Sequence, residues 1–443
     1  MRTTQVLAEY VHALDHASLP RGSIDAVARC VLDLVACAAA GLHESGVAAA
    51  RKLAATQYPG GPAEVWFTAQ RATASGAVFA NSTAAMILDW DDGFRTARGH
   101  PGAGVIPAAL AAAAETGASG AEVVAAIVAG YEVSVRVGRA KRWYTSTGTW
   151  SPHGAIAAAG RIRQTPPEQL AHALAMATQC APVLKGKGGS QFDQLSWSDV
   201  KEGIAWGALT GMTSLYMAEG GATGALEILD SERHYEVARI TEGLGGTPLV
   251  AGTYFKPYAC CRHVHAPLDA FDALLATHAI DPADIESVEV HTYSGTFNLP
   301  NAARPPDYLE VQFSVPYCLA IRALHGRAAL MPIEHAVVGD EALAAFAERI
   351  MLHPDPAIEA RFPAESPTRV VVHSRRGRFE SPVTTPRGDP DAPMAWDDLV
   401  EKLRVATRRT LSPERQDALV AAVERLAAGD LAPLRAELAK PAV

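Results

Sequence analysis

Apolar residues recur at helical spacing along roughly the first 255 residues, in blocks joined by short connections. One block opens with Ser119-Gly-Ala-Glu122, a capping box that predicts a helix start. Thr165-Pro-Pro-Glu168 predicts a second capped start with proline in the first turn, and residues 204–218 continue the pattern. No period of 20–50 residues recurs, so a helical solenoid is not supported.

The pattern changes after about residue 281. Alternating apolar and polar residues predict strands at 287–293 and 368–373. The segment 381–394 is rich in Pro, Gly and Asp and predicts a loop. Helices are expected at 315–324, 340–350, 397–403 and 412–428, with a last short turn at 433–438.

These elements predict a mainly α protein with one large helical domain and a smaller α/β insertion. We expect residues 1–265 and 396–443 to form the helical domain and residues 266–395 to form the insertion. The helical tail is expected to pack back onto the first domain. Abundant alanine favours helices that approach one another closely.

Composition excludes several classes of protein. Of the 443 residues, 49% are hydrophobic and 20% are charged, as in a folded protein with a sizeable core. The net charge of −9, without a basic block, argues against nucleic acid as a partner. No apolar run is long enough for a membrane span, the first residues lack the apolar core expected of a signal peptide, and six cysteines do not make a disulfide framework. We therefore expect a cytoplasmic protein.

A charged segment follows an apolar helix expected at 84–88. It reads Asp89-Trp-Asp-Asp-Gly-Phe-Arg-Thr-Ala-Arg-Gly-His100-Pro. Asp89 and Asp92 are three residues apart and share a face if the helix continues. The later glycines and proline predict a loop that carries Arg98 and His100. Charged loops that leave a buried helix often build active sites, although a solvated helix end has the same composition.

Two basic residues stand at expected helix starts. His153 precedes an alanine-rich helix, whose N-terminus lowers the pKa of a nearby histidine. A capping or core histidine is the alternative. Lys201 opens another helix, where it is either an exposed lysine or a point charge that holds a carboxylate. The run 185–189 fails the test for a phosphate-binding loop.

The segment Lys256-Pro-Tyr-Ala-Cys-Cys-Arg-His-Val-His265 combines several reactive side chains. No second Cys or His pair completes four zinc ligands, so we expect no metal. A mixture that includes Lys256, Tyr258 and His265 fits anion binding and acid–base chemistry better. No Gly-x-Gly-x-x-Gly follows a strand, and no cofactor is expected.

Together, these segments resemble the MmgE/PrpD family over essentially the whole chain. That family includes 2-methylcitrate dehydratase, cis-aconitate decarboxylase and iminodisuccinate epimerase. The resemblance implies a large all-α domain built from both chain ends, a smaller α/β lid, a site between them and a homodimer. It also implies metal-free chemistry at the α-carbon of small carboxylates. It rests on Leu88-Asp-Trp-Asp-Asp with His100-Pro, His153-Gly, Lys201, Lys256-Pro-Tyr with His265, Gln312-Phe-Ser-Val-Pro-Tyr317 and Pro386-Arg-Gly-Asp-Pro390.

The positions that match the family's active site are Asp89, His100, His153, Lys201 and Lys256. The resemblance implies that His100 transfers protons and that Asp89 orients it. The two lysines, with Arg98, would hold substrate carboxylates and stabilise the enediolate. His153 would handle a second proton or bind a carboxylate.

The chain departs from the family pattern at two places. Gly93 stands where several members have Thr or Ser, and Lys201-Glu-Gly differs from the usual sequence after that lysine. The loop before His100 looks most like that of the epimerase member. These departures predict a smaller or different carboxylate as the substrate. For the reaction, we expect a lyase that dehydrates a hydroxy-carboxylate, with an isomerase or epimerase second, a decarboxylase third and a non-catalytic helical scaffold as the remaining alternative.

Overall fold

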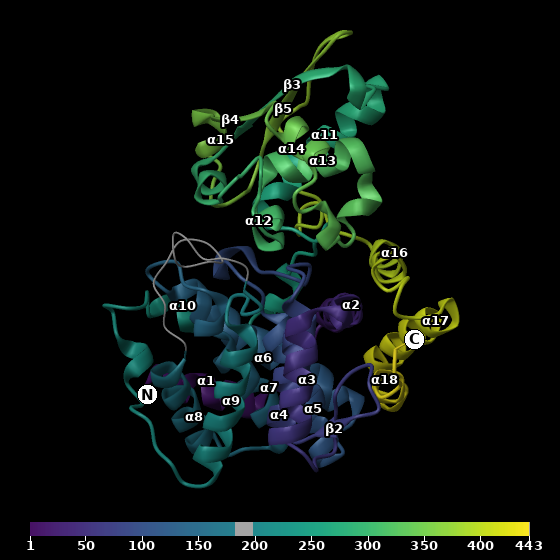
Figure 1. Ribbon diagram of the computed structural model, residues 1–443. Helices are drawn as coiled ribbons and strands as arrows, with labels where there is room; N and C mark the ends of the chain where they lie inside the picture. Colours follow the sequence, from purple (N-terminus) through teal and green to yellow (C-terminus); the bar gives the residue numbers. More distant parts are fainter. Residues whose placement is uncertain (182–197, 443) are drawn as a thin grey trace.

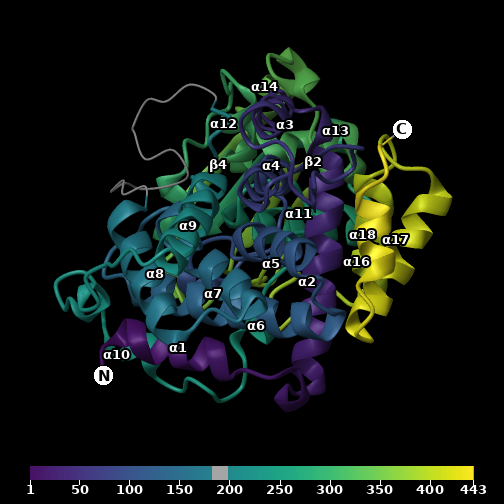
Figure 2. The same cartoon turned by 90° about the horizontal axis from the view of Figure 1, so that it is seen from below.

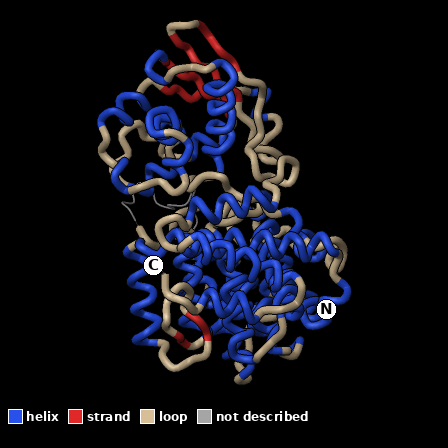
Figure 3. The backbone as a smooth tube through the Cα atoms, turned by 90° about the vertical axis from the view of Figure 1, so that its right-hand side faces the viewer, coloured by secondary structure: helices blue, strands red, loops and turns tan. Residues whose placement is uncertain are grey.

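The computed structural model describes residues 1–181 and 198–442. It is mainly α, as the sequence predicts. Figure 3 shows helices through most of the chain, with the larger sheet confined to one end. In the described part of the chain, no helix combines the length and the apolar character needed to cross a bilayer.

Closely packed helices form the first part of the chain (Figures 1 and 2). A two-stranded antiparallel sheet, β1 (Ala63–Glu64) with β2 (Arg71–Ala72), lies between two of these helices. The helices are α1 (Thr3–Ala13), α2 (Arg21–Ala40), α3 (Ser45–Gln57), α4 (Ala74–Met86), α5 (Gly102–Thr116), α6 (Gly120–Ala140), α7 (Ser151–Arg163), α8 (Pro167–Cys180), α9 (Ile204–Glu219) and α10 (Ala238–Thr241).

Small residues bring the central helices together. Every residue of α5 from Gly102 to Ala113 is buried, and α5 packs against α4, α6 and α7. A Cβ atom on Gly154 of α7 would lie 2.7 Å from the Val105 side chain of α5 and 2.8 Å from that of Ser134 on α6. Glycine is therefore required where these three helices meet.

A four-stranded sheet characterises the second part of the chain. The strand order is β4-β3-β5-β6; β3 pairs parallel with β4, and the other pairs are antiparallel. The strands are β3 (Ile285–Thr292), β4 (Ile350–Pro354), β5 (Arg369–Ser374) and β6 (Gly377–Glu380). The helices of this part are α11 (Arg262–His278), α12 (Tyr308–Gln312), α13 (Val315–His325), α14 (Glu341–Ala347) and α15 (Pro356–Glu359).

The chain then returns to the helical part through α16 (Trp396–Ala406), α17 (Pro413–Ala427) and α18 (Ala432–Leu438). Helices α16 and α17 pack against α2, as Figure 2 shows. Two hydrophobic clusters result. One joins residues 7–259 to residues 394–438, and the other lies within residues 258–372.

Two local predictions differ from the structure. The helix expected at 340–350 ends at Ala347, because Ile350 begins β4 alongside β3. Thr165 does not cap α8, which begins after Pro166; the Thr165 hydroxyl donates to Glu219 instead. Ser119 does form the predicted capping box with Glu122. The run 185–189 lies outside the described residues.

Candidate active site

The loop between α4 and α5 carries the acidic residues of the site. Helix α4 ends at Met86, and Asp89 has a left-handed backbone with φ of 51°. The helix therefore does not continue through this segment, and Asp89 and Asp92 do not share a helix face. Asp89, Asp91 and Asp92 are all buried.

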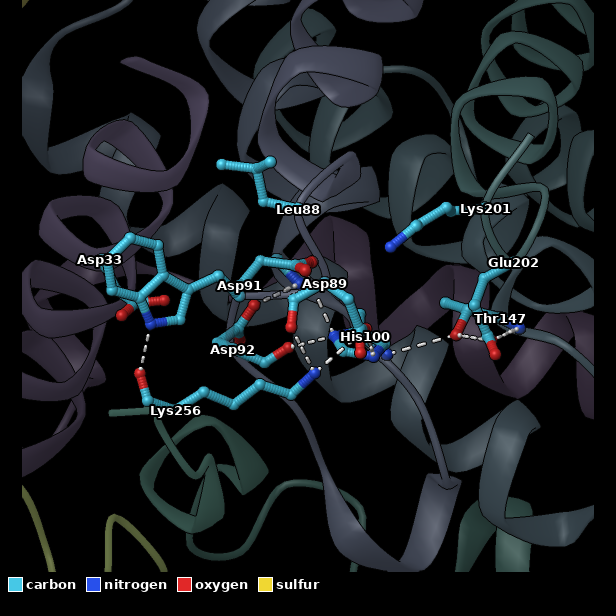
Figure 4. A network of polar contacts seen from close by, with 12 residues as sticks. Asp33, Leu88, Asp89, Asp91, Asp92, His100, Thr147, Lys201, Glu202 and Lys256 are labelled. Atoms are coloured by element: carbon cyan, nitrogen blue, oxygen red, sulfur yellow. Dashed lines mark hydrogen bonds and ion pairs between the residues drawn. The ribbon is translucent and has the colours of Figure 1, made fainter. Parts of the chain in front are cut away.

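His100 lies between two of these carboxylates (Figure 4). Its Nε2 is 3.4 Å from Asp89 Oδ1, and its Nδ1 is 3.3 Å from Asp91 Oδ1 and 2.9 Å from the Asp92 carbonyl oxygen. Burial alone would lower the pKa of His100, but Asp91 and then Asp89 outweigh it and raise the pKa to about 9. The imidazole is therefore charged at neutral pH and can donate a proton.

Lys256 neutralises Asp89 from the other side. Its Nζ donates to Asp89 Oδ1 at 3.0 Å and to the Asp89 carbonyl oxygen at 2.8 Å. Burial raises the pKa of Asp89, but Lys256 and His100 outweigh that effect and lower it. Burial works against the ammonium of Lys256, yet Asp89 raises the pKa of that lysine. Both side chains of this buried pair are therefore charged.

Asp92 has a different environment from the other two acids. Its carboxyl accepts hydrogen bonds from the Tyr131 hydroxyl at 2.8 Å and from the Gly102 backbone N–H at 3.1 Å. Burial, followed by the charge of Asp91, raises its pKa to about 8. Asp92 therefore holds the start of α5 in place and is mostly protonated at neutral pH.

Lys201 approaches the cluster from the segment before α9. Gly203, with φ of 65°, ends that segment, so Lys201 precedes the helix rather than opening it. Its Nζ donates to Gln312 Oε1, and Figure 4 shows it pointing toward Asp89 and His100. Burial lowers the pKa of Lys201 to about 8. This lysine can therefore lose its proton near neutral pH.

Gln312 connects the two parts of the chain at this point. Besides accepting from Lys201, it donates through Nε2 to the Leu88 carbonyl oxygen at 2.8 Å. It lies at the end of α12, in the sheet-bearing part, which faces the helical part in Figure 1. Its side chain therefore fixes Lys201 relative to the residue that precedes Asp89.

A second contact holds the backbone of His100. The His100 N–H donates to Thr147 Oγ1 at 3.2 Å, and that hydroxyl donates to Glu202 Oε2 at 2.8 Å. Glu202 directly follows Lys201, so the segment that carries Lys201 also holds the backbone of His100 through Thr147 (Figure 4).

Three of these residues have the types and spacing that a metal ion would need. Ligand atoms of Asp89, Asp91 and His100 lie within 4.8 Å of one another. However, the ammonium of Lys256 already lies 3.0 Å from Asp89 Oδ1. A divalent cation there would meet a fixed positive charge.

A cavity of about 340 Å³ borders Lys201. Apolar side chains of α3, α4 and α9 line it, and the rings of Phe79 and Trp206 meet edge to face at 4.9 Å between centroids in its wall. The lining includes Lys201 but neither Asp89 nor His100, so the cavity adjoins the lysine side of the cluster only.

The other predicted residues make their hydrogen bonds outside the cluster. His153 is buried on α7, where it bonds to the Trp150 carbonyl oxygen and the Thr178 hydroxyl; burial lowers its pKa to about 3. Tyr258 donates to Asp269, and the buried His265 contacts the Cys260 carbonyl oxygen. Arg98 is exposed. None of the four makes a hydrogen bond or ion pair with Asp89, His100, Lys201 or Lys256 within the ranges described.

Among the residues that sequence reasoning missed, two contact the side chains of His100 and Lys201. Asp91 stands in the acidic run but receives no separate role, because only the fold shows that it faces His100. Gln312 belongs to a motif that supports the family resemblance, yet its contact with Lys201 joins residues 111 positions apart. No local pattern in the chain indicates that contact.

Two family models match the chain. The MmgE/PrpD N-terminal domain matches residues 5–241, and the MmgE/PrpD C-terminal domain matches residues 258–428. Among characterised relatives, a cis-aconitate decarboxylase of Aspergillus terreus is 25% identical over 72% of this chain and 71% of its own length. The cis-aconitate decarboxylase-like protein oryM of Aspergillus oryzae is 23% identical over 93% of this chain and 92% of its own.

Proposed function

Because the chain belongs to the MmgE/PrpD family, we propose that it is a lyase that removes water from a small hydroxylated di- or tricarboxylate. One observation carries this proposal: the buried side chain of Lys201 points toward His100, which is held between two carboxylates. His100 has a pKa of about 9 and Lys201 a pKa of about 8, the reverse of the usual order for these two side chains. Opposite shifts in neighbouring groups indicate one acid and one base.

The roles of the two residues follow from this order. Neutral Lys201 takes the proton from the carbon next to a substrate carboxylate, and the electron pair of that C–H bond forms the new C=C bond. The bond from the adjacent carbon to its hydroxyl oxygen breaks, and the His100 imidazolium protonates the leaving oxygen as water. Lys201 ends as an ammonium and His100 as a neutral imidazole, and one proton transfer between them through solvent restores both.

The surrounding charges assist both steps. Lys256 keeps Asp89 ionised, and Asp89 with Asp91 keeps His100 charged until the proton is needed. The charges of Lys256 and His100 also attract an anionic substrate and oppose the negative charge that develops on the enediolate. This assignment keeps proton transfer for His100 and makes Lys201 the base, in place of the carboxylate binding first expected of that lysine.

Decarboxylation is the second candidate. It is supported by the names of the relatives and by the charge of His100, because loss of CO₂ leaves a carbanion that needs only a proton donor. Lys201 would then only bind a carboxylate. The two reactions therefore differ in whether Lys201 must lose its proton.

We also propose that residues 266–395 act as a lid over this site. The contacts of Gln312 with Lys201 and Leu88 support a lid, because they link the sheet-bearing part to both sides of the cluster. Movement of the lid on substrate binding would change the contacts of Gln312 with Lys201 and Leu88.

Proton NMR in D₂O tests the proposed reaction. The purified protein is mixed with a panel of small hydroxy-, amino- and unsaturated di- and tricarboxylates, and new olefinic signals are expected from a hydroxylated member. Loss of an α-proton with inverted configuration and no new product would instead identify an isomerase. Release of CO₂ would identify a decarboxylase.

Variants assign the roles in the same assay. His100→Ala is expected to stop turnover, and circular dichroism checks that the variant keeps its helical fold. Lys201→Met stops dehydration but spares decarboxylation. The matched control is Lys52→Met, which changes an exposed lysine on α3 and should react as the wild type does. Wild-type turnover by His100→Ala would contradict the proposal.

A further inference from the structure

Tyr254 lies against the loop that carries the acidic residues. Its backbone forms an isolated antiparallel bridge with Gly93, the residue after Asp92. The Gly93 N–H donates to the Tyr254 carbonyl oxygen at 3.0 Å, and the Tyr254 N–H donates to the Gly93 carbonyl oxygen at 2.9 Å. Tyr254 is thus held to the same backbone that places Asp89, Asp91 and His100.

The phenol end of Tyr254 occupies the space next to Gly93. A Cβ atom on Gly93 would lie 2.3 Å from both Cζ and the hydroxyl oxygen of Tyr254. Real Cβ atoms essentially never approach so closely, so any larger residue at position 93 would displace the hydroxyl. Gly93 is therefore required by the position of the tyrosine.

Two cations flank the tyrosine. The Arg262 guanidinium lies 4.5 Å from the centroid of its ring and is itself anchored by Asp389 at 2.8 Å. Lys256 lies two residues further along the chain, with its ammonium on Asp89. Cations beside a phenol strengthen its hydroxyl as a hydrogen-bond donor to an anion.

The Tyr254 hydroxyl has no partner in the described part of the chain, although the residue is only 7% exposed. The hydroxyl is therefore free to donate to a molecule that reaches the acidic loop, and its place beside that loop distinguishes it from other unpartnered hydroxyls. An unused donor beside the acid–base cluster therefore points to a ligand.

We infer that Tyr254 contacts the substrate, and that its hydroxyl donates a hydrogen bond to a carboxylate or hydroxyl oxygen of the molecule bound beside His100. The inference rests on the proposed function and deepens it. Tyr254 takes part of the binding role first expected of Lys256, whose ammonium is occupied by Asp89. Gly93 becomes a specificity position, because its lack of a side chain is what admits the phenol.

Calorimetric titration with succinate and tricarballylate, which carry no leaving hydroxyl, tests this contact. Tyr254→Phe keeps the ring and removes only the hydroxyl, and it should weaken binding of at least one of these carboxylates by about tenfold or more. Thermal unfolding of the variant should match that of the wild type.

Tyr235→Phe is the matched control. Like Tyr254, Tyr235 is buried, with 5% of its surface exposed, and its backbone forms an isolated antiparallel bridge. The ammonium of Lys141 lies over its ring, and its hydroxyl has no hydrogen-bond partner in the described ranges. It does not touch the acidic loop, so its loss should leave affinity unchanged.

The outcomes separate the two proposals. Equal affinity of wild type and Tyr254→Phe for every carboxylate that binds would overturn the role of Tyr254 alone. If the wild type binds neither probe, both the carboxylate site and the role of Tyr254 are contradicted. Weaker binding by Tyr254→Phe, with unchanged binding by Tyr235→Phe, supports both.

Discussion

The ammonium of Lys402 on α16 lies 2.6 Å from Oδ1 of Asp33 on α2, and both side chains are almost completely buried. The same ammonium donates to the Trp90 carbonyl oxygen at 2.7 Å and lies 5.1 Å from the centroid of the Trp90 ring. Trp90 stands between Asp89 and Asp91. Helix α16 therefore contacts the acidic loop at Trp90 and fixes it to α2.

Removing one partner of this pair should be strongly destabilising. Lys402→Met leaves Asp33 buried without its counter-charge, and we expect the free energy of unfolding to fall by about 3–5 kcal/mol. Urea unfolding followed by circular dichroism measures the loss. Arg404→Met breaks an exposed pair with Asp417 and should cost at most about 1 kcal/mol. Equal effects of the two variants would contradict the importance of the buried pair.

The pH dependence of kcat/KM should be bell-shaped if the proposed dehydration is correct. Lys201 must be neutral, which it becomes as the pH rises through about 8, and His100 must be charged, which it ceases to be above about 9. The maximum is expected between these values. A profile that lacks the acidic limb and falls only near pH 9 would favour decarboxylation instead.

Asp91→Asn should shift the alkaline limb of the pH profile of kcat/KM to lower pH. The charge of Asp91 is the largest influence that raises the pKa of His100, so its removal should bring this limb below pH 9. Asp92→Asn is the control on the same loop and should move the limb less, because Asp92 is mostly protonated at neutral pH. A limb that stays in place in Asp91→Asn would mean that another group is the acid.

Variants of Gln312 test whether Lys201 causes the acidic limb of the pH profile of kcat/KM. Gln312→Glu places a carboxylate beside the Lys201 ammonium, so the pKa of Lys201 should rise and the acidic limb should move to higher pH. Gln312→Leu removes a hydrogen bond to the charged lysine and should move the limb the other way. Shifts of the same sign in both variants would exclude Lys201 as the titrating base.

The sequence predicts the charged members of the site better than their arrangement. Asp89 and His100 stand on one loop, so a local pattern is enough to place them near each other. Lys402 and Asp33 are 369 positions apart, and Gln312 and Lys201 are 111 apart. Their contacts depend on how the two hydrophobic clusters assemble. The spacing of apolar residues along the chain predicts single helices and strands, but not how these pack together.

Contacts between distant segments also explain why sequence reasoning misjudged His153 and missed Tyr254. His153 stands at a helix start as expected, but the neighbouring helix supplies Thr178 as the partner of its Nε2, which the local sequence does not indicate. Tyr254 stands next to a recognised segment and was missed, because only the fold shows its ring filling the space beside Gly93.

Chelation should leave activity unchanged. Asp89, Asp91 and His100 have metal-ligand spacing, but Lys256 supplies the positive charge at Asp89, and a charged His100 has no free lone pair for a metal. Overnight dialysis against EDTA, followed by assay and elemental analysis, measures both activity and metal content. As a matched variant, Lys256→Met removes the competing cation and should bind added divalent metal more tightly than the wild type. Activity lost on dialysis and restored by a divalent metal would show instead that the three ligands hold a functional ion.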